Sequence, residues 1–422
     1  MKLPKPKRDL ILLGGGTESI PIILRASQDY RVIVVDQNAQ SPGILWAKAN
    51  PELGVAWLGN VYSSRSCLRT AQMAVKFAAK ATISTSYDFA GVMCAATDAP
   101  DSQAWVAETL GMPSIGRAQA ELGRDKWRQY EWLKAHNIPV PESKLLEKTA
   151  TVADAESYDL IKPLAGRGAR GVQRIIPSDF NNQKYRALAE SLPGYKQLIA
   201  QKWITGDQLS TESVIHNGNI TFTAVALRNY DKLDTYYPFV VENGADMPFH
   251  LSPEQHSNLT SLILRATLAL GWDNLTVKCD IVMSQGAFFL IEIAPRLSGG
   301  YFCSHYIPSV YDYDIIGAAI DLATGSKNVR EYEYDGYSYV SQRFLFPKSE
   351  WIGKKIKQMP LVADAGSIVL YTNYKKAGDT IMPVTYHGTR LAQVITRGNS
   401  QSQAKRDAEK VIEQCEALVE VE

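Results

Sequence analysis

The chain has 422 residues, of which 45% are hydrophobic and 21% charged, a balance typical of a folded globular protein. This length allows two or three domains. The formal net charge of +1 gives no electrostatic basis for binding nucleic acid or an anionic membrane, and no stretch is apolar for long enough to cross a bilayer. The five cysteines are scattered and lack C-x-x-C spacing, so we expect no disulfide framework or zinc site, and a cytoplasmic protein.

Residues 9–36 have the pattern of a strand, a helix and a second strand. The apolar run DLILL follows a basic N-terminus, as in a signal peptide, but it is short and ends in glycines, which favours a strand. The turn GGGTES, the segment IPIILRAS and the strand RVIVVD complete a parallel βαβ unit. Gly15 and Gly16 could hold an anionic group at the helix N-terminus; the alternative is close packing of strand against helix. The spacing is not G-x-G-x-x-G, so a dinucleotide site is only weakly indicated.

The α/β pattern continues to residue 116, with helices at 64–79 and 101–110 around a strand at 91–96. The loop 97–100 follows this strand and could form the rim of a substrate cleft. We place the first domain boundary at 116. Residues 117–136 then predict a helix, followed by a strand entry that contains prolines.

Residues 159–174, DLIKPLAGRGARGVQR, predict a strand that brings Lys162 to a glycine-rich turn. The turn contains Gly166, Arg167, Gly168 and Gly171. Glycines let the backbone close over phosphates, and the lysine supplies a positive charge there. No G-K-[ST] follows, so this is not a P-loop. The alternative is a hairpin turn with incidental basic residues.

After a charged helix at 184–191, residues 197–228 predict three strands, broken at 205–207 and at 216–219. The second break contains Asn217-Gly218, a strong hairpin signal. Alternation places Glu212 and Arg228 in one sheet, where they could serve a substrate or a metal. Residues 229–258 have the composition of a polar loop near the substrate, and 254–271 that of an amphipathic helix ending at a glycine.

Residues 276–294 predict a β-hairpin with its turn at 284–286, and the two strands carry Asp280 and Glu292. A carboxylate on an apolar strand costs free energy unless it is paired, and two side by side on a rigid sheet suit Mg²⁺, which takes oxygen ligands and shares them with phosphates. The alternative is a half-exposed hairpin whose acids face solvent. Next come Arg296 and the backbone of Ser298, Gly299 and Gly300, which suit a phosphate or a carboxylate.

A helix at 312–323 precedes a change of composition at about residue 330. The last part of the chain predicts strands at 337–347, 367–374 and 389–398, then a helix over 400–419 with Ser400 or Ser402 as its N-cap.

Three motifs, in this order, resemble those of the ATP-grasp ligases. They are D-K-W at 125–127, K-P-x-x-G-x-G-x-x-G-V at 162–172, and E-I-A-P-R-L-S-G-G at 292–300. The last motif resembles the metal-binding hairpin of carboxylate–amine ligases and of carboxyaminoimidazole ribonucleotide synthetase. The resemblance implies a fold of mixed α/β and α+β class. A parallel-sheet domain (1–116) would precede a two-lobed ATP-grasp domain (117–329), which holds ATP between two sheets, and a small C-terminal α+β domain (330–422) would follow.

The resemblance also implies site residues. Asp280 and Glu292 would bind the metal, and Arg296 and Lys162 would act in catalysis. The ATP-binding residues would be Lys126, Lys162, Gly166, Arg167, Gly168, Gly171, Gln201, Trp203, Ile204 and Gln208. The substrate-binding residues would be Gly15, Gly16, Glu212, Arg228, Arg296, Ser298, Gly299 and Gly300. The sequence departs from the family at the hinge, where Lys202 stands in place of the usual acid and Gln208 lies where the ribose acid is often found.

The implied function is an ATP-dependent carboxylate–amine ligase. With ATP and Mg²⁺ or Mn²⁺ it would convert a carboxylate into an acyl phosphate, which an amine attacks to give an amide, ADP and phosphate. The partners would be a small-molecule carboxylate and a small-molecule amine, with no nucleic acid and no membrane, and this family often forms homodimers. One alternative is a bicarbonate-dependent carboxylase or synthetase acting through carboxyphosphate. Another, motivated by the atypical hinge, is a non-catalytic ATP-binding protein.

Overall fold

The computed structural model describes residues 7–59, 88–147, 152–164, 166, 168–175, 181, 183, 187, 197–333, 338–362 and 366–422. The predicted helix at 64–79, most of the one at 184–191, and Arg167 lie outside these residues. Within the described ranges, no helix combines the length and the apolar character needed to cross a membrane.

The N-terminal part is a parallel sheet of order β3-β2-β1-β4. Its strands are β1 (Asp9–Leu13), β2 (Arg31–Val35), β3 (Ala56–Leu58) and β4 (Phe89–Cys94). The helices are η1 (Thr17–Ser19), α1 (Ile20–Asp29), α2 (Pro42–Ala49), η2 (Pro51–Leu53) and α4 (Pro100–Thr109). Every residue of β1 is buried, as expected for a parallel strand covered on both faces. The predicted βαβ unit is confirmed.

The helix expected at 117–136 is two helices, α5 (Arg117–Leu122) and α6 (Lys126–Ala135), so that prediction is wrong. The physical reason is the cap at Asp125, whose carboxylate accepts hydrogen bonds from the backbone N–H groups of Trp127 and Arg128 and starts a new helix. This cap makes Lys126 the first residue of α6.

A small antiparallel sheet follows, of order β5-β8-β6-β7. Its strands are β5 (Ser143–Leu146), β6 (Leu160–Pro163), β7 (Gln173–Arg174) and β8 (Leu198–Gln201), with η3 (Val152–Asp154) after the first. Lys162 therefore lies in β6, immediately before the glycine-rich turn, as predicted.

The large sheet has eight strands in the order β13-β12-β9-β10-β11-β14-β17-β16, and all its pairs are antiparallel. The strands are β9 (Asp207–His216), β10 (Asn219–Asn229), β11 (Gly244–Met247), β12 (Leu275–Ser284), β13 (Ala287–Ala294), β14 (Tyr339–Leu345), β16 (Ile368–Asn373) and β17 (Ala392–Gly398). Strand β11 lies in the segment predicted as a loop. Because β11 pairs with β14, the sheet is continuous across residue 330.

Both predicted hairpins are confirmed, and each has a two-residue turn with positive φ angles. Asn217 and Gly218 have φ values of 50° and 71°, and Gln285 and Gly286 have 51° and 82°. Such turns match the twist of the paired strands.

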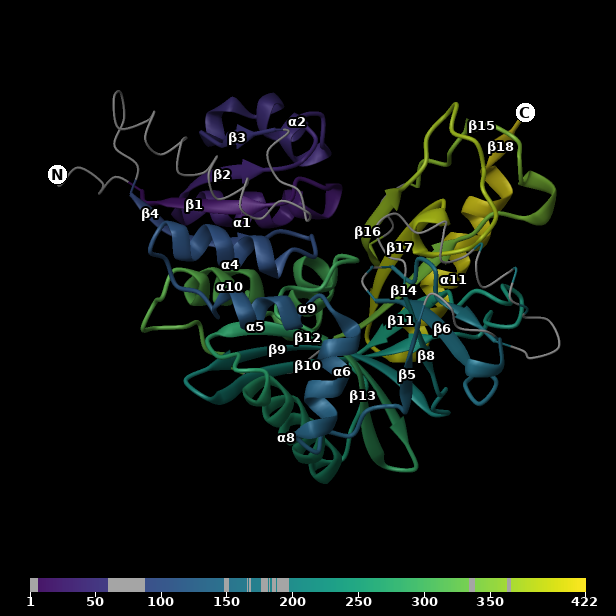
Figure 1. Ribbon diagram of the computed structural model, residues 1–422. Helices are drawn as coiled ribbons and strands as arrows, with labels where there is room; N and C mark the ends of the chain where they lie inside the picture. The colour runs from purple at the N-terminus through teal and green to yellow at the C-terminus, as the bar shows by residue number, and fades with distance from the viewer. Residues whose placement is uncertain are drawn as a thin grey trace.

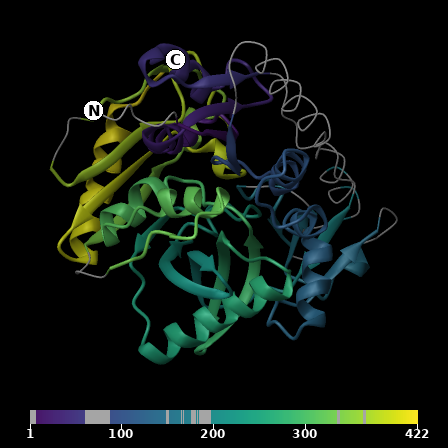
Figure 2. The same ribbon diagram turned by 90° about the vertical axis from the view of Figure 1, so that its left-hand side faces the viewer.

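One face of the large sheet packs on α8 (Pro253–Ala269), which begins at a Ser252 capping box. On the other face lie η4 (Phe302–Tyr306), α9 (Ile307–Tyr311) and α10 (Ile315–Ala323), which share one core with the N-terminal sheet. Figure 1 shows α9 and α10 between the two sheets, and Figure 2 shows α8 on the outside.

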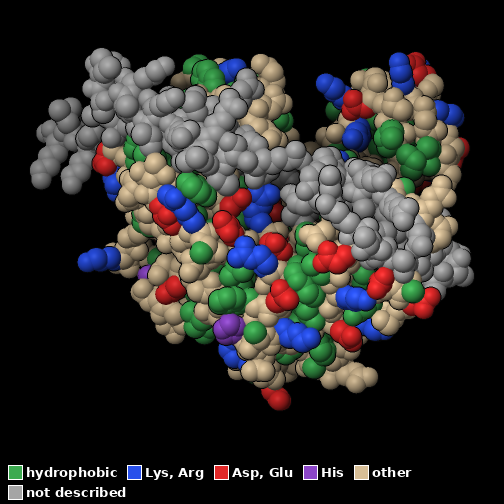
Figure 3. Space-filling model, in the orientation of Figure 1, with side chains coloured by type: hydrophobic (Ala, Val, Ile, Leu, Met, Phe, Trp, Pro, Cys, Tyr) green, Lys and Arg blue, Asp and Glu red, His purple; other side chains and the backbone are tan. Residues whose placement is uncertain are grey.

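The C-terminal part packs α11 (Gln401–Leu418), capped by Ser400, on β14 and β17. Its remaining elements are η5 (Ser349–Trp351), β15 (Ile356–Gln358), η6 (His387–Thr389) and β18 (Glu420–Val421). In the space-filling view the surface is hollowed at the top, between the N-terminal and C-terminal parts (Figure 3).

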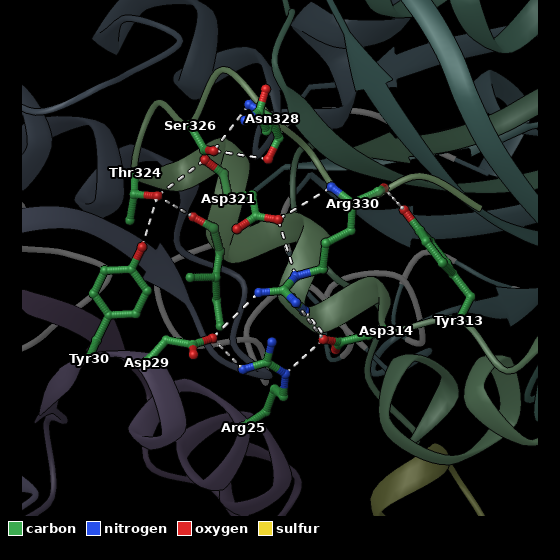
Figure 4. Close-up of polar contacts among 12 residues, drawn as sticks. Arg25, Asp29, Tyr30, Tyr313, Asp314, Asp321, Thr324, Ser326, Asn328 and Arg330 are labelled. Carbon is green, nitrogen blue, oxygen red and sulfur yellow. Dashed lines mark hydrogen bonds and ion pairs between the residues drawn. The ribbon is translucent and has the colours of Figure 1, made fainter. Parts of the chain in front are cut away.

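A network of ion pairs joins α1 to α10 (Figure 4). The Arg25 guanidinium lies 2.8 Å from the Asp29 carboxylate and 2.7 Å from that of Asp314. Arg330 lies 3.4 Å from Asp29, 3.6 Å from Asp314 and 3.1 Å from Asp321. These ion pairs connect the N-terminal part to α10, which packs on the large sheet.

Candidate active site

Asp280 and Glu292 are directly paired residues on β12 and β13, as the hairpin predicted. On the other side of β12, Lys278 pairs with Glu212 of β9. Paired residues of an antiparallel sheet project to the same face. The polar side chains therefore share the face opposite α8, whose side of the sheet is apolar.

The two carboxylates are surrounded by cations. Arg228 Nη1 lies 3.1 Å from Asp280 Oδ1, and Lys278 Nζ contacts Asp280 Oδ2. Burial opposes ionisation of Asp280, but Arg228 and Lys278 outweigh it and lower its pKa. Burial likewise acts against Glu292, but Lys126, with Nζ 3.4 Å from Oε1, is the main group that lowers its pKa to about 2. Both acids are ionised at neutral pH.

These acids could hold a divalent cation. Among the described residues there is no cluster of three or more His, Cys, Asp or Glu side chains that would ligate a metal alone. Two carboxylates on neighbouring strands nevertheless fit Mg²⁺, which often takes only one or two protein carboxylates and completes its shell with phosphates and water. Since both oxygens of Asp280 contact cations, a bound metal would have to replace Lys278 or Arg228 there.

Lys162 and Lys126 lie near these carboxylates. Lys162 Nζ donates to Gln201 Oε1 over 3.0 Å, and Lys126 Nζ donates to the carbonyl oxygen of Gly166 over 3.1 Å. Burial first and Lys126 second lower the pKa of Lys162 to about 8, while Glu292 acts in the opposite direction. A negatively charged ligand would favour the protonated lysine.

The predicted hinge residues connect the two sheets, between β8 and β9. The backbone N–H of Trp203 donates to Asp159 Oδ2 over 2.7 Å, and Gln208 Nε2 donates to the carbonyl oxygen of Ile204 over 3.4 Å. Gly206 has a φ of +156°, and a Cβ there would lie 2.2 Å from the carbonyl oxygen of Met283. The hinge thus packs directly against the β12–β13 hairpin.

Arg296 contacts the N-terminal part of the chain, and Glu212 contacts the loop that follows Arg296. Arg296 Nε donates to Asp98 Oδ1 over 3.1 Å, which brings the predicted cleft rim to the hairpin. The backbone N–H of Ser298 donates to Glu212 Oε2 over 3.0 Å, whereas Glu212 Oε1 has no partner among the described residues. Burial raises the pKa of Glu212 to about 7.

The backbone donors predicted to bind an anion are partly occupied by carboxylates. Besides Ser298, the N–H of Gly300 donates to Glu18 Oε2 over 2.8 Å, and a Cβ on Gly299 would lie 2.9 Å from the same oxygen. The N–H of Gly15 donates to Asp36 Oδ2 over 2.6 Å.

At Gly15 the packing alternative is realised. A Cβ there would lie 2.5 Å from Ser41 Oγ, whereas Gly16 faces open space. The substrate-binding role of both glycines stays a prediction.

Sequence reasoning missed Lys278 and Glu242. Lys278 precedes Asp280 by two positions, so strand alternation could have found it. Glu242, whose Oε2 accepts a hydrogen bond from Arg228 Nε over 2.7 Å, lies in the segment predicted as a loop and gave no signal.

Comparison with known families and proteins agrees with this geometry. Residues 123–300 match the family model of the ATP-grasp domain. Carnosine synthase 1 of Homo sapiens is 24% identical over an alignment of 245 positions that covers 53% of this chain and 29% of that protein. D-alanine–D-alanine ligase of Chromohalobacter salexigens is 26% identical over 200 residues, 44% of this chain and 60% of that one. The chain thus spans less than a third of the length of human carnosine synthase 1.

Solved structures resemble the whole chain. The L-amino acid ligase from Bacillus licheniformis superimposes with a TM-score of 0.77 at 16% identity and covers 99% of both chains. The N5-carboxyaminoimidazole ribonucleotide synthetase from Thermotoga maritima has a TM-score of 0.62 at 14% identity, covering 98% of this chain and 99% of that one. The predicted fold class and the resemblance to ATP-grasp proteins are confirmed.

Proposed function

We propose that this chain, which contains an ATP-grasp domain at residues 123–300, is an ADP-forming ligase that joins a carboxylate to an amine. The observation that carries the proposal is the meeting of Asp280 and Glu292 with Lys126 and Lys162 beside the hinge between the two sheets. The names of the relatives, carnosine synthase, D-alanine–D-alanine ligase and L-amino acid ligase, support an amide or peptide bond as the product.

Each residue has a role in this proposal. Lys126, Lys162 and the glycine-rich loop would bind the phosphates of ATP, and Gln201 to Ile204 with Gln208 would line the nucleotide site. Asp280 and Glu292 would hold Mg²⁺ or Mn²⁺, which supplies positive charge between the β- and γ-phosphates. Arg296 would orient the carboxylate that receives the phosphoryl group.

Glu212 is the best placed proton acceptor for the attacking amine. Its carboxyl is buried beside the side chains of Ser298 and Cys303, and burial raises its pKa to about 7, close to the value at which a general base works best at neutral pH. Arg296 lies near enough to influence that pKa, so the acid-activating and amine-activating groups would lie in the same cleft.

We expect small-molecule substrates, a homodimer and a cytoplasmic location. The domain boundaries at 116 and 329 also remain predictions. Strands on both sides of residue 329 belong to the same large sheet, because β11 pairs with β14.

The experiment that tests the function is release of phosphate and ADP from Mg-ATP in the presence of pooled carboxylic acids, with and without pooled amines. Release that needs both pools supports the ligase. Release with bicarbonate alone would favour the carboxylase, which the likeness to carboxyaminoimidazole ribonucleotide synthetase keeps as a second candidate. Binding of ATP without turnover of any acid would contradict both.

A further inference from the structure

The C-terminal segment 386–390 lies against the glycine-rich loop, although more than two hundred residues separate them. The backbone N–H of His387 donates to the carbonyl oxygen of Gly168 over 3.0 Å. Arg170 Nη2 donates to the hydroxyl of Tyr386 over 3.0 Å, and its guanidinium lies 4.6 Å from the centre of that ring. A Cβ on Gly168 would lie 3.6 Å from the Cβ of His387. The segment therefore holds the loop by backbone, cation–π and packing contacts.

Two buried nitrogens of this segment have no hydrogen-bond partner within the described ranges: Nε2 of His387 and Nε of Arg390. Arg390 is not free to turn away, because its guanidinium lies 3.5 Å from the centre of the Phe344 ring and its Nη2 donates to the carbonyl oxygen of Glu242 over 2.6 Å. Arg390 Nε is always a donor, and His387 Nε2 is one in the tautomer that carries its hydrogen there; an unpaired buried donor costs about 1–3 kcal/mol. Such a cost is offset when a ligand accepts the hydrogen bond.

The charge around these nitrogens is positive. Burial is the main cause that lowers the pKa of His387, and Arg390, Arg228 and Lys278 lower it further. Arg228 and Lys278 also contact Asp280, so this group of cations borders the proposed metal site. The three cations Arg390, Arg228 and Lys278 face only two carboxylates, Glu242 and Asp280, so buried positive charge remains that a further anion would neutralise.

We propose that His387 and Arg390 complete a binding site for an oxyanion, to whose positive charge Arg228 and Lys278 contribute. The identity of the anion rests on the proposed ligase function. It is either the phosphoryl group of ATP or the carboxylate of the substrate, both of which present oxygen acceptors to these donors.

Calorimetry of the full chain tests the site without an amine and without turnover, so failure of the ligase proposal would leave this test valid. Mg-ADP is titrated first, and inorganic phosphate or acetate is then titrated into the Mg-ADP complex. For His387→Ala and for Arg390→Gln we expect anion binding to weaken about tenfold, as for loss of a charge-assisted hydrogen bond, with Mg-ADP affinity changed less than about twofold. The control is Met382→Ala, a side chain of the same region that is 57% exposed, and it is expected to leave both affinities unchanged.

The two probes distinguish the sources of the anion. Selective loss of phosphate binding identifies the phosphoryl group, and selective loss of acetate binding identifies the substrate carboxylate. Arg390→Lys keeps the charge but removes Nε, so it provides the same test if Arg390→Gln does not fold. The proposal is overturned if the wild type binds neither anion in the presence of Mg-ADP, or if the variants that fold bind both anions as the wild type does.

Discussion

Asp280 has both carboxylate oxygens in contact with cations, Arg228 on one side and Lys278 on the other. Its partner Glu292 faces Lys126 in the same way. In this state the lysines neutralise the charge that a divalent ion would neutralise, since buried carboxylates need a counter-charge. If Mg-ATP binds here, Asp280 and Glu292 would hold the metal ion, and Lys126 and Lys278 would be free to pair with the phosphates.

We expect Asp280→Asn and Glu292→Gln to fold but to lose Mg-ATP turnover by at least about a hundredfold. Each amide keeps the size of the side chain but removes the negative charge that the metal needs. Circular dichroism checks the fold, and coupled ADP release checks turnover. Glu254→Gln is the control, because Glu254 is an exposed acid in the first turn of α8, on the other face of the sheet. Turnover close to that of the wild type in either variant would refute the metal assignment.

Glu212 should make stability depend on pH. Burial raises its pKa from 4.5 to about 7, so between these values the folded protein holds a proton that the unfolded chain has lost. The free energy of unfolding contributed by this group therefore falls as the pH rises through that window. Glutamine cannot ionise, so Glu212→Gln should be more stable than the wild type at pH 8 by about 2–3 kcal/mol, and nearly equal at pH 5.

Urea unfolding at the two pH values measures this difference. The same variant should lose turnover, since glutamine cannot accept a proton from the amine. An equal change in the free energy of unfolding at both pH values would show that Glu212 is ionised throughout, and the raised pKa would no longer support it as the proton acceptor.

At the scale of single elements, the hinge is held by one close contact. A Cβ at Gly206 would lie only 2.2 Å from the carbonyl oxygen of Met283 in the hairpin, so no side chain fits there. The φ angle of Gly206 is also unfavourable for any other residue. We expect Gly206→Ala to displace the hinge, to lower the free energy of unfolding by about 1–3 kcal/mol and to raise the Kd for Mg-ATP. Thermal unfolding and ATP titration measure both effects.

The control for the hinge is Gly366→Ala, because a Cβ at Gly366 meets nothing within 4 Å. If Gly206→Ala and Gly366→Ala behave alike, the hinge does not depend on the contact with Met283.

The elements that could be predicted from the sequence are those specified by local chemistry. The Asn217-Gly218 and Gln285-Gly286 turns identify their hairpins, and the second hairpin sets Asp280 opposite Glu292. The division between α5 and α6 was missed because an N-cap at Asp125 competes with an otherwise continuous helical pattern. Strand β11 was missed because its partners, β10 and β14, are supplied by distant parts of the chain.

The same distinction applies to the candidate site. Spacing within one motif predicted Lys162, Asp280, Glu292 and Arg296. Pairing between distant residues did not follow from the sequence: Asp98 with Arg296, and His387 with Gly168, are adjacent only because separate parts of the fold meet. Such contacts bring the N-terminal and C-terminal parts of the chain to the candidate site.

At the scale of the whole molecule, the N-terminal sheet and the large sheet share one hydrophobic core through α9 and α10. The approach is close at Gly91, where a Cβ would lie 2.3 Å from the carbonyl oxygen of Ala323. The N-terminal part is thus fixed in position, which keeps Asp98 beside Arg296.

The ion-pair network of Figure 4 should contribute to that fixed arrangement. Arg330 meets three carboxylates, and one of them, Asp321, has a side chain only 14% exposed. Arg330→Gln leaves Asp321 without this counter-charge, whereas Arg25 still pairs with the other two. Since the Arg330 side chain is itself 38% exposed, solvent screens the interaction, and we expect a loss of only about 1–2 kcal/mol.

A network that acts through charge should lose part of its effect in salt. Urea unfolding of Arg330→Gln and the wild type should therefore differ more at 0.05 M than at about 1 M NaCl. Lys357→Gln is the matched control: its pair with Glu420 spans 3.2 Å but is 63% and 52% exposed, so it should cost close to nothing. If Arg330→Gln is as neutral as this control, the shared hydrophobic core alone fixes the N-terminal part, and the charges of α1 and α10 have no measurable role in stability.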